Sequence, residues 1–333
     1  MLSIQHSSFN RYKAAPSNIF KGAPVSELLK RGDKALNENR FAEALTHYSE
    51  ASKIEPENAE IYKKTARAQF GLKDYKSAEE NFKIYLSEHP DDIDVLIELG
   101  ETQRLTGFYN KALETFTRAQ KLDNKNDLAS RSILETKNNM LAVFSPEKAK
   151  KEKEEFAAVN LRRALEMTVN YMTPEYMSAL KDVKVLFAKT ESMGGTQNIA
   201  QYENYKQAIT VSNSYIYASP QVIAAYLAHE SVHAHDNDAY TSVAEEQDAY
   251  ETAAKFWIKY SNGVKDPEMD YAAELYKQSP DTLKKRVEEI YTLRDPSIAK
   301  TSPNHPPKKL FHWRTKEQDA AASHAIKKYD VIA

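Results

Sequence analysis

The sequence has 333 residues, of which 41% are hydrophobic and 28% are charged, and its net charge is −2. The length favours two domains, and the apolar content supports a real core. No stretch approaches the roughly 20 consecutive apolar residues of a membrane-spanning helix. The chain has no cysteine, so a disulfide scaffold is excluded.

Residues 1–24 are polar and lack the apolar segment of a secretory signal. We expect these residues to form a flexible leader and the protein to be cytoplasmic. The absence of cysteine does not decide the compartment, since cytosolic and secreted proteins can both lack it.

Residues 25–126 follow a 34-residue period. Three registers match at the same offsets: Gly32, Phe41, Ala44, Tyr48, Ala51 and Pro56; Ala66, Tyr75, Ala78, Phe82, Tyr85 and Pro90; and Gly100, Tyr109, Ala112, Phe116, Ala119 and Asn124. This pattern resembles the tetratricopeptide repeat, in which each unit has two helices and small residues stand where the helices touch. The resemblance implies a helical solenoid, and we expect a further helix at 127–142 to cap it.

The resemblance also implies a concave face, formed by the first helix of each repeat, that binds a peptide or a partner protein. Members of this family that bind chaperone tails hold a C-terminal carboxylate with a Lys and an Asn near the glycine of the first repeat. Asp33 stands where that Asn would be. Its negative charge would repel a carboxylate, so we expect a different ligand. The alternative is that the repeats only brace the domain that follows.

The second domain, residues 143–295, begins with a linking helix. Ser145-Pro146-Glu147 is a helix start, and the run from Lys148 to Glu155 mixes both charges at helical spacing. This is typical of a solvated helix face, and we expect a semi-rigid spacer that continues to Met172. Because acidic residues interleave with the lysines, we expect no nucleic-acid partner.

Three candidate strands follow a short helix that begins at Thr173. They are Val183–Phe187, the segment from Gln207 to Ser212, and Tyr215-Ile216-Tyr217. Their β-branched and aromatic content predicts a small twisted sheet that packs on the next helix.

That next helix carries the pattern His229-Glu230-Ser231-Val232-His233. Ser219-Pro220 is a good helix start, so the pattern falls late on a helix of roughly 15 residues. Residues four apart share a face, so His229 and His233 can both direct a ring nitrogen at one zinc ion. Glu230 lies about 100° round the helix, where it can act as a general base on water.

A second helix follows a turn at residues 235–238. Ser242-Val243-Ala244-Glu245 is a capping box, in which Ser242 caps the helix and Glu245 reaches back to it. This leaves Glu246 as the third metal ligand, with Glu245 as the alternative. Asp236, one turn beyond His233, is expected to be a cap or a partner to a ligand histidine.

These two helices resemble the gluzincin branch of the zincin metallopeptidases, whose pattern is HExxH followed by Glu-x-x-Ala. Here the second part is Glu246-Gln247-Asp248-Ala249. The resemblance implies one zinc on His229, His233 and Glu246, Glu230 as general base, and an α+β zincin-like domain. It also implies that the strand near 207–217 holds an extended peptide by strand addition, although an ordinary core hairpin is the alternative. Tyr250 stands where many gluzincins have Asp or Asn.

The remaining residues contribute less to the site. Candidate donors to the reaction oxyanion are Tyr205, Tyr215, Tyr217 and Tyr240. Asp266-Pro267-Glu268 and Ser279-Pro280-Asp281 begin two more helices, and residues 296–333 form an extension with an amphipathic segment.

The sequence therefore predicts a zinc metallopeptidase that hydrolyses peptide bonds, with repeats that recruit a protein substrate or regulator. The alternative is a repeat-based adaptor in which the HExxH domain is inactive or binds metal structurally.

Overall fold

The computed structural model describes residues 23–173, 183–190, 192–193, 196–236, 242–294, 298, 300 and 331–332. The chain divides into two compact units, Met1–Asn124 and Lys125–Ala333. The described residues are mostly helical, as predicted, and the second unit also holds a small sheet. Three predicted segments lie wholly or mostly outside the described residues: the leader, the short helix that begins at Thr173, and the amphipathic C-terminal segment.

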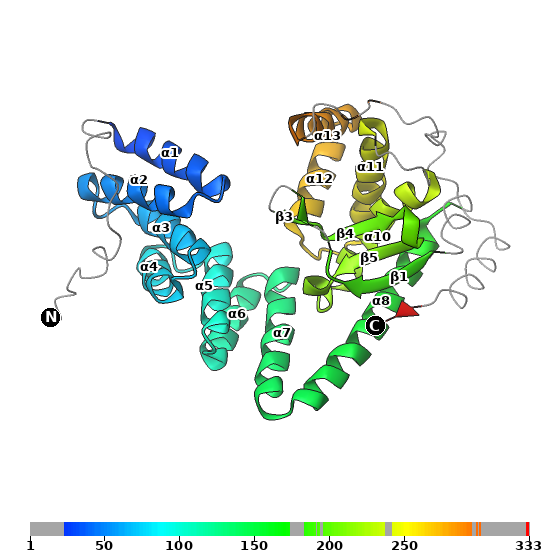
Figure 1. Ribbon diagram of the computed structural model, residues 1–333, viewed down its shortest axis with the longest axis horizontal. Coiled ribbons are helices and arrows are strands. Elements are labelled where there is room, and N and C mark those ends of the chain that lie inside the picture. Colours follow the sequence, from blue (N-terminus) through cyan, green and yellow to red (C-terminus); the bar gives the residue numbers. More distant parts are fainter. Residues whose placement is uncertain are drawn as a thin grey trace. The chain divides into compact units, whose positions relative to one another are not determined.

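Among the described residues of the first unit, six helices form three packed pairs (Figure 1). The pairs are α1 (Val25–Asn37) with α2 (Phe41–Ile54), α3 (Ala59–Gly71) with α4 (Tyr75–Glu88), and α5 (Ile93–Leu105) with α6 (Tyr109–Leu122). Each pair also packs on the next, through α2 with α3 and α4 with α5. The predicted repeat solenoid is therefore confirmed.

The turn inside each pair is built in the same way. Asn39 (φ 57°), Lys73 (φ 62°) and Gly107 (φ 81°) all adopt left-handed backbone conformations at the same position of the repeat. Only glycine adopts this conformation without strain from a Cβ atom. The backbone conformation of the turn therefore repeats every 34 residues, although only the third turn has glycine at this position and the first two have Asn39 and Lys73.

Glycine in the first helix lets an aromatic ring of the second helix pack against the backbone. A Cβ atom on Gly32 would lie 2.3 Å from Cε1 of Tyr48, and one on Gly100 would lie 2.6 Å from Cε1 of Phe116. Distances this short require the ring or the helix to move. The small residue at this position therefore sets how closely the two helices of a repeat approach.

The second unit contains six described α-helices and the sheet. The helices are α7 (Asp127–Phe144), α8 (Pro146–Tyr171), α10 (Pro220–Asp236), α11 (Val243–Tyr260), α12 (Pro267–Gln278) and α13 (Pro280–Arg294). The predicted starts of α8, α12 and α13 are confirmed. No described helix combines the length and the apolar character that a membrane span needs.

Helix α7 lies within the second unit, although the sequence assigned it to the repeats as a cap. It packs on α8. At its start, Oδ1 of Asp127 accepts a hydrogen bond of 2.6 Å from the backbone N–H of Ser219, immediately before α10. The start of α7 is thereby tied to the start of the motif helix. The boundaries between the four predicted segments themselves stay predictions.

The sheet has the order β4-β5-β1-β6, in which β1 pairs in parallel with β5 and β6, and β4 pairs antiparallel with β5. Its strands are β1 (Lys184–Ala188), β4 (Ala200–Glu203), β5 (Ala208–Ser212) and β6 (Val331–Ile332). A separate pair joins β2 (Ser192–Met193) to β3 (Thr196–Gln197). The first two predicted strands are confirmed as β1 and β5, whereas β4 and β6 were not predicted.

The predicted strand Tyr215-Ile216-Tyr217 is wrong. The chain instead forms a 3₁₀-helix at Asn213–Tyr215, where the Ser212 side chain accepts a hydrogen bond from the N–H of Ser214. Asn160 of α8 then donates two hydrogen bonds, to the carbonyl oxygens of Ile216 (2.9 Å) and Ala218 (2.6 Å). These bonds hold the segment in a turn that leads into α10.

Helix α10 is the centre of the second unit. It packs on α8, on α11, and on strands β4 and β5 (Figure 1). Most of its residues are buried, including the run from Val222 to Val232. An amphipathic surface helix would show a polar stripe toward water, so the polar residues of α10 are directed at other protein groups instead.

We predict that Gly100→Val destabilises the repeats by about 1–3 kcal/mol, because the added side chain would overlap the ring of Phe116. Hydrogen exchange of the α5 and α6 amides measures this local stability. In a Phe116→Leu background the same substitution should cost less, since the ring no longer opposes it. An equal cost in both backgrounds would contradict the proposed close approach.

Candidate metal centre

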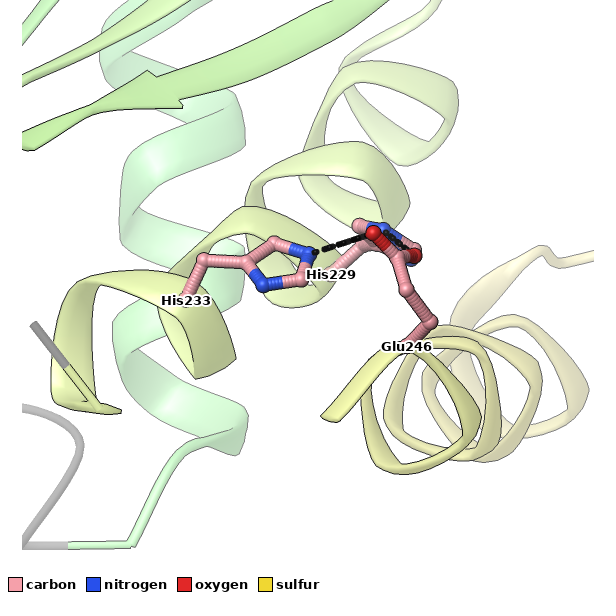
Figure 2. Close-up of side chains that lie close together, drawn as sticks. All are labelled: His229, His233 and Glu246. Carbon is pink, nitrogen blue, oxygen red and sulfur yellow. Dashed lines mark hydrogen bonds and ion pairs between the residues drawn. The ribbon is translucent and has the colours of Figure 1, made fainter. Parts of the chain in front are cut away.

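The two histidines of the HExxH pattern lie on one face of α10, and Glu246 faces them from the first turn of α11. Figure 2 shows the three side chains converging from the two helices. His229 and Glu246 are 8% and 7% exposed, and the side chain of His233 is 12% exposed. The predicted antiparallel neighbours α10 and α11 therefore bring the three predicted ligands together.

The distances between the ligand atoms fit one tetrahedral ion. Nε2 of His229 lies 3.4 Å from Nε2 of His233, and these nitrogens lie 3.5 and 3.6 Å from oxygens of Glu246. One ligand atom from each residue can be chosen so that all lie within 4.8 Å of one another. Ligands at 2.0–2.2 Å from a tetrahedral zinc stand about 3.3–3.6 Å apart. The donor set of two imidazoles and a carboxylate is also the type that zinc accepts.

The electrostatics of the cluster also favour a cation. Burial favours the neutral form of Glu246, yet His233, His229 and the hydroxyl of Tyr291 lower its pKa to about 2. Burial likewise opposes charge on His233, but Glu246, Glu245 and Glu230 raise its pKa to about 10. Oε2 of Glu246 is buried and accepts no hydrogen bond. The carboxylates of Glu230, Glu245 and Glu246 therefore lie close together, and no Lys or Arg is among the described partners of Glu246. A divalent ion bound here would neutralise part of their negative charge.

Glu245 orients the ring of His233. Its Oε1 lies 2.5 Å from Nδ1 of His233, so the ring donates a hydrogen from Nδ1. Its Nε2 then faces Glu246 and His229, where a metal ion would take the place of the Nε2 proton. A carboxylate on the far nitrogen of a ligand histidine fixes its tautomer and raises its basicity. The Ser242 cap is confirmed, because its side chain accepts from the N–H of Glu245 at 3.1 Å. The Glu245 side chain, however, bonds to His233 and was wrongly expected to reach back to Ser242.

Glu230, the predicted general base, is 7% exposed. Its Oε2 accepts a hydrogen bond of 2.7 Å from the backbone N–H of Tyr202, in β4.

In the described sheet, β4 is an edge strand, while β5 lies between β4 and β1. We expected from the sequence that the strand near 207–217 adds an extended peptide, but both edges of β5 are already paired, with β4 and with β1. The described edge nearest to the ligands is β4.

Two tyrosines complete the surroundings of the ligands. The ring of Tyr250 stands edge-on to that of His229, with centroids 4.7 Å apart and planes at 85°. Tyr291, on α13, hydrogen-bonds to Glu246 through its hydroxyl. Sequence reasoning missed Tyr291, because nothing in the local pattern of α13 marks a residue that folds back onto a ligand so distant in the chain.

The candidate oxyanion donors lie in different surroundings. Tyr215 packs edge-on against Tyr226 at 5.9 Å, beneath the guanidinium of Arg131, and Tyr217 packs on Phe156 at 5.2 Å. The side chain of Tyr205 and the whole of Tyr240 lie outside the described part of the chain.

Asp236, which was expected to be a cap or a partner to a ligand histidine, is buried in the last turn of α10.

A comparison with known protein families supports the repeats. Residues 35–95 match the family model of the tetratricopeptide repeat. No curated protein matches the chain. Among solved structures, the first tetratricopeptide domain of Spaghetti (RPAP3), bound to the HSP90 peptide SRMEEVD, is 18% identical with a TM-score of 0.34. That match covers 35% of this chain and 92% of the other. The family-model match alone supports tetratricopeptide repeats in the first unit, and such repeats suggest a role in protein interaction.

We predict one zinc per chain in the wild-type protein and none in His229→Ala, because two ligands alone hold zinc weakly. Elemental analysis after dialysis against a weak chelator measures the metal. His235→Ala, which removes a histidine of the same helix that is not in the cluster, should keep the metal. Loss of zinc in both variants would show that the helix, and not the cluster, was disturbed.

Glu245→Ala should weaken zinc binding by about 10–100-fold while the three ligands remain, because the ring of His233 loses the group that orients it. Competition with a chromogenic chelator measures the affinity. An affinity equal to that of the wild type would remove Glu245 from the site.

Proposed function

We propose that the second unit is a zinc metallopeptidase domain of zincin type, with the metal on His229, His233 and Glu246. The observation that carries this proposal is the convergence of these ligand atoms within 4.8 Å beside the buried carboxylate of Glu230. A structural zinc site needs no general base, so the buried carboxylate next to the ligands favours catalysis. When bound, zinc supplies a Lewis acid and lowers the pKa of water to about 7.

Glu230 is the residue that we expect to move protons. It follows His229 directly on α10, so its side chain leaves the helix about 100° from that of His229. The carboxylate would therefore lie next to the metal ligands without being a ligand itself. There it would accept a proton from the attacking water and later deliver one to the leaving amine. The N–H of Tyr202 holds one of its oxygens at 2.7 Å, which fixes the carboxylate and leaves the other oxygen for water.

Glu245 and Tyr291 would keep the ligands in place during the reaction. Glu245 holds His233 through Nδ1, and Tyr291 hydrogen-bonds to Glu246. Each contact reduces the freedom of a ligand side chain before any metal arrives, which is the preorganisation that a metal site needs.

The repeats would bind a protein that serves as substrate or regulator. On their first helices, cations pair with acids of the neighbouring helix: Lys64 lies 2.8 Å from Asp33, and Arg67 lies 2.8 Å from Glu98. A third pair, Arg104 with Glu101, lies within α5. Because these cations already have carboxylate partners, a free C-terminal carboxylate would have to displace one. The partner is therefore expected to be recognised by other chemistry.

The second candidate is a repeat-based adaptor with an inactive or structural metal domain. It is favoured by the family match, which lies in the repeats alone. The two candidates agree on the repeats and differ on Glu230, which matters only if the second unit hydrolyses peptides.

Glu230→Gln should reduce hydrolysis of a fluorogenic peptide library by about 10²–10⁴-fold and leave zinc bound, because the amide cannot accept a proton. Glu251→Gln is the matched control, since Glu251 is also buried but pairs with Lys255 and Lys284. We expect the control to retain wild-type activity. If zinc-loaded wild-type protein cleaves nothing in the library, the adaptor takes the place of the peptidase.

A further inference from the structure

Tyr250 occupies the position from which a carboxylate could have held His229. It lies one helical turn beyond Glu246 on α11, so both side chains share a face. Its ring meets the His229 ring edge-on at 4.7 Å and 85°, an arrangement that aromatic pairs prefer. The phenol therefore limits the rotation of the imidazole by packing, without using either ring nitrogen.

The hydroxyl of Tyr250 is itself held. It donates a hydrogen bond of 3.2 Å to Oε1 of Glu268. The Tyr291 hydroxyl, which bonds to Glu246, also lies within hydrogen-bonding reach of Tyr250.

Glu268 connects the two ligand helices. Its Oε2 shares the hydroxyl of Tyr226 with Oδ1 of Asp266, each at 3.2 Å, while its Oε1 accepts from Tyr250. Tyr226 lies three residues before His229 on α10, and Tyr250 lies four residues after Glu246 on α11. One carboxylate therefore bridges both helices, one turn away from a ligand on each of them.

The position of Glu268 is fixed by the start of α12. Asp266 caps this helix by accepting from the N–H of Met269 at 3.0 Å, and Pro267 is the first helical residue. A carboxylate in the first turn is also favoured by the helix dipole. Because Glu268 is exposed, water competes for its oxygens, and the ring of Tyr250, which is half-buried, is the stronger element of the pair.

We propose that Tyr250 is a positioning residue that holds the ring of His229 for the metal, and that Glu268 fixes Tyr250 by bridging it to Tyr226. This inference rests on the metal site of the proposed function and adds how the first ligand is oriented. Groups that orient ligand histidines contribute about 10–100-fold to metal affinity.

The test measures zinc affinity by chelator competition and the visible spectrum of the cobalt(II)-substituted protein. Tyr250→Ala should weaken zinc binding by about 10–100-fold and alter the cobalt spectrum, because the His229 ring gains freedom. Tyr250→Phe and Glu268→Gln should each have a smaller effect in the same direction. The double variant should bind zinc no more weakly than the single variant with the larger loss, since both changes weaken the same hydrogen bond between Tyr250 and Glu268.

Asp270→Asn is the matched control. Asp270 also lies in α12 and also accepts a bond from α11, at 2.7 Å from Nε1 of Trp257, but far along that helix from Glu246. This variant should lower thermal stability without changing zinc affinity or the cobalt spectrum. If Tyr250→Ala does not fold, as judged by far-ultraviolet circular dichroism, the Tyr250→Phe and Glu268→Gln pair decides the matter.

The outcomes separate the two proposals. Wild-type protein that binds no zinc would overturn the metal site and this inference together. Wild-type protein that binds zinc, with unchanged affinity and spectrum in the Tyr250 and Glu268 variants, would overturn this inference alone. Equal losses in Asp270→Asn would show a general effect of loosening α12 and would also overturn it.

Discussion

Buried charge between α10 and α11 is the constraint on which the second unit depends. His229, Glu230, Glu245 and Glu246 are all less than a tenth exposed, and an ionised group in such a place is costly unless it is paired or hydrogen-bonded. Partners therefore come from every side: a backbone N–H from β4, a hydroxyl from α13, and an imidazole from α10 itself. The sheet and the surrounding helices therefore pack around this polar cluster as well as around an apolar core.

What the sequence predicted well was determined by local spacing. His229 and His233 share a face because four residues make about one turn, and the Ser242 cap fixed where α11 begins and hence where Glu246 lies. The repeats were predictable for the same reason, since a small residue such as Gly32 recurs with the aromatic ring that packs on it. In each case the residues that decide the structure lie within one or two helices of each other.

What the sequence could not give depends on contacts between distant elements. The segment 215–217 has the composition of a strand, yet Asn160 of α8 holds it in a turn. Glu245 satisfied a local capping pattern, but a histidine on another helix was the stronger partner. Tyr291 and the N–H of Tyr202 reach the cluster only because α13 and β4 fold against it. No spacing rule links such residues.

The ion pairs of the repeats have a consequence for cooperativity. Lys64–Asp33 and Arg67–Glu98 each join the first helices of adjacent repeats, and their side chains are between 22% and 40% exposed. In a repeat array, stability is the sum of a term for each repeat and a term for each interface between neighbours. Partly exposed pairs are screened by salt, so ionic strength acts on the interface terms and leaves the individual repeats almost unchanged. Salt would therefore alter how sharply the array unfolds more than how stable any one repeat is.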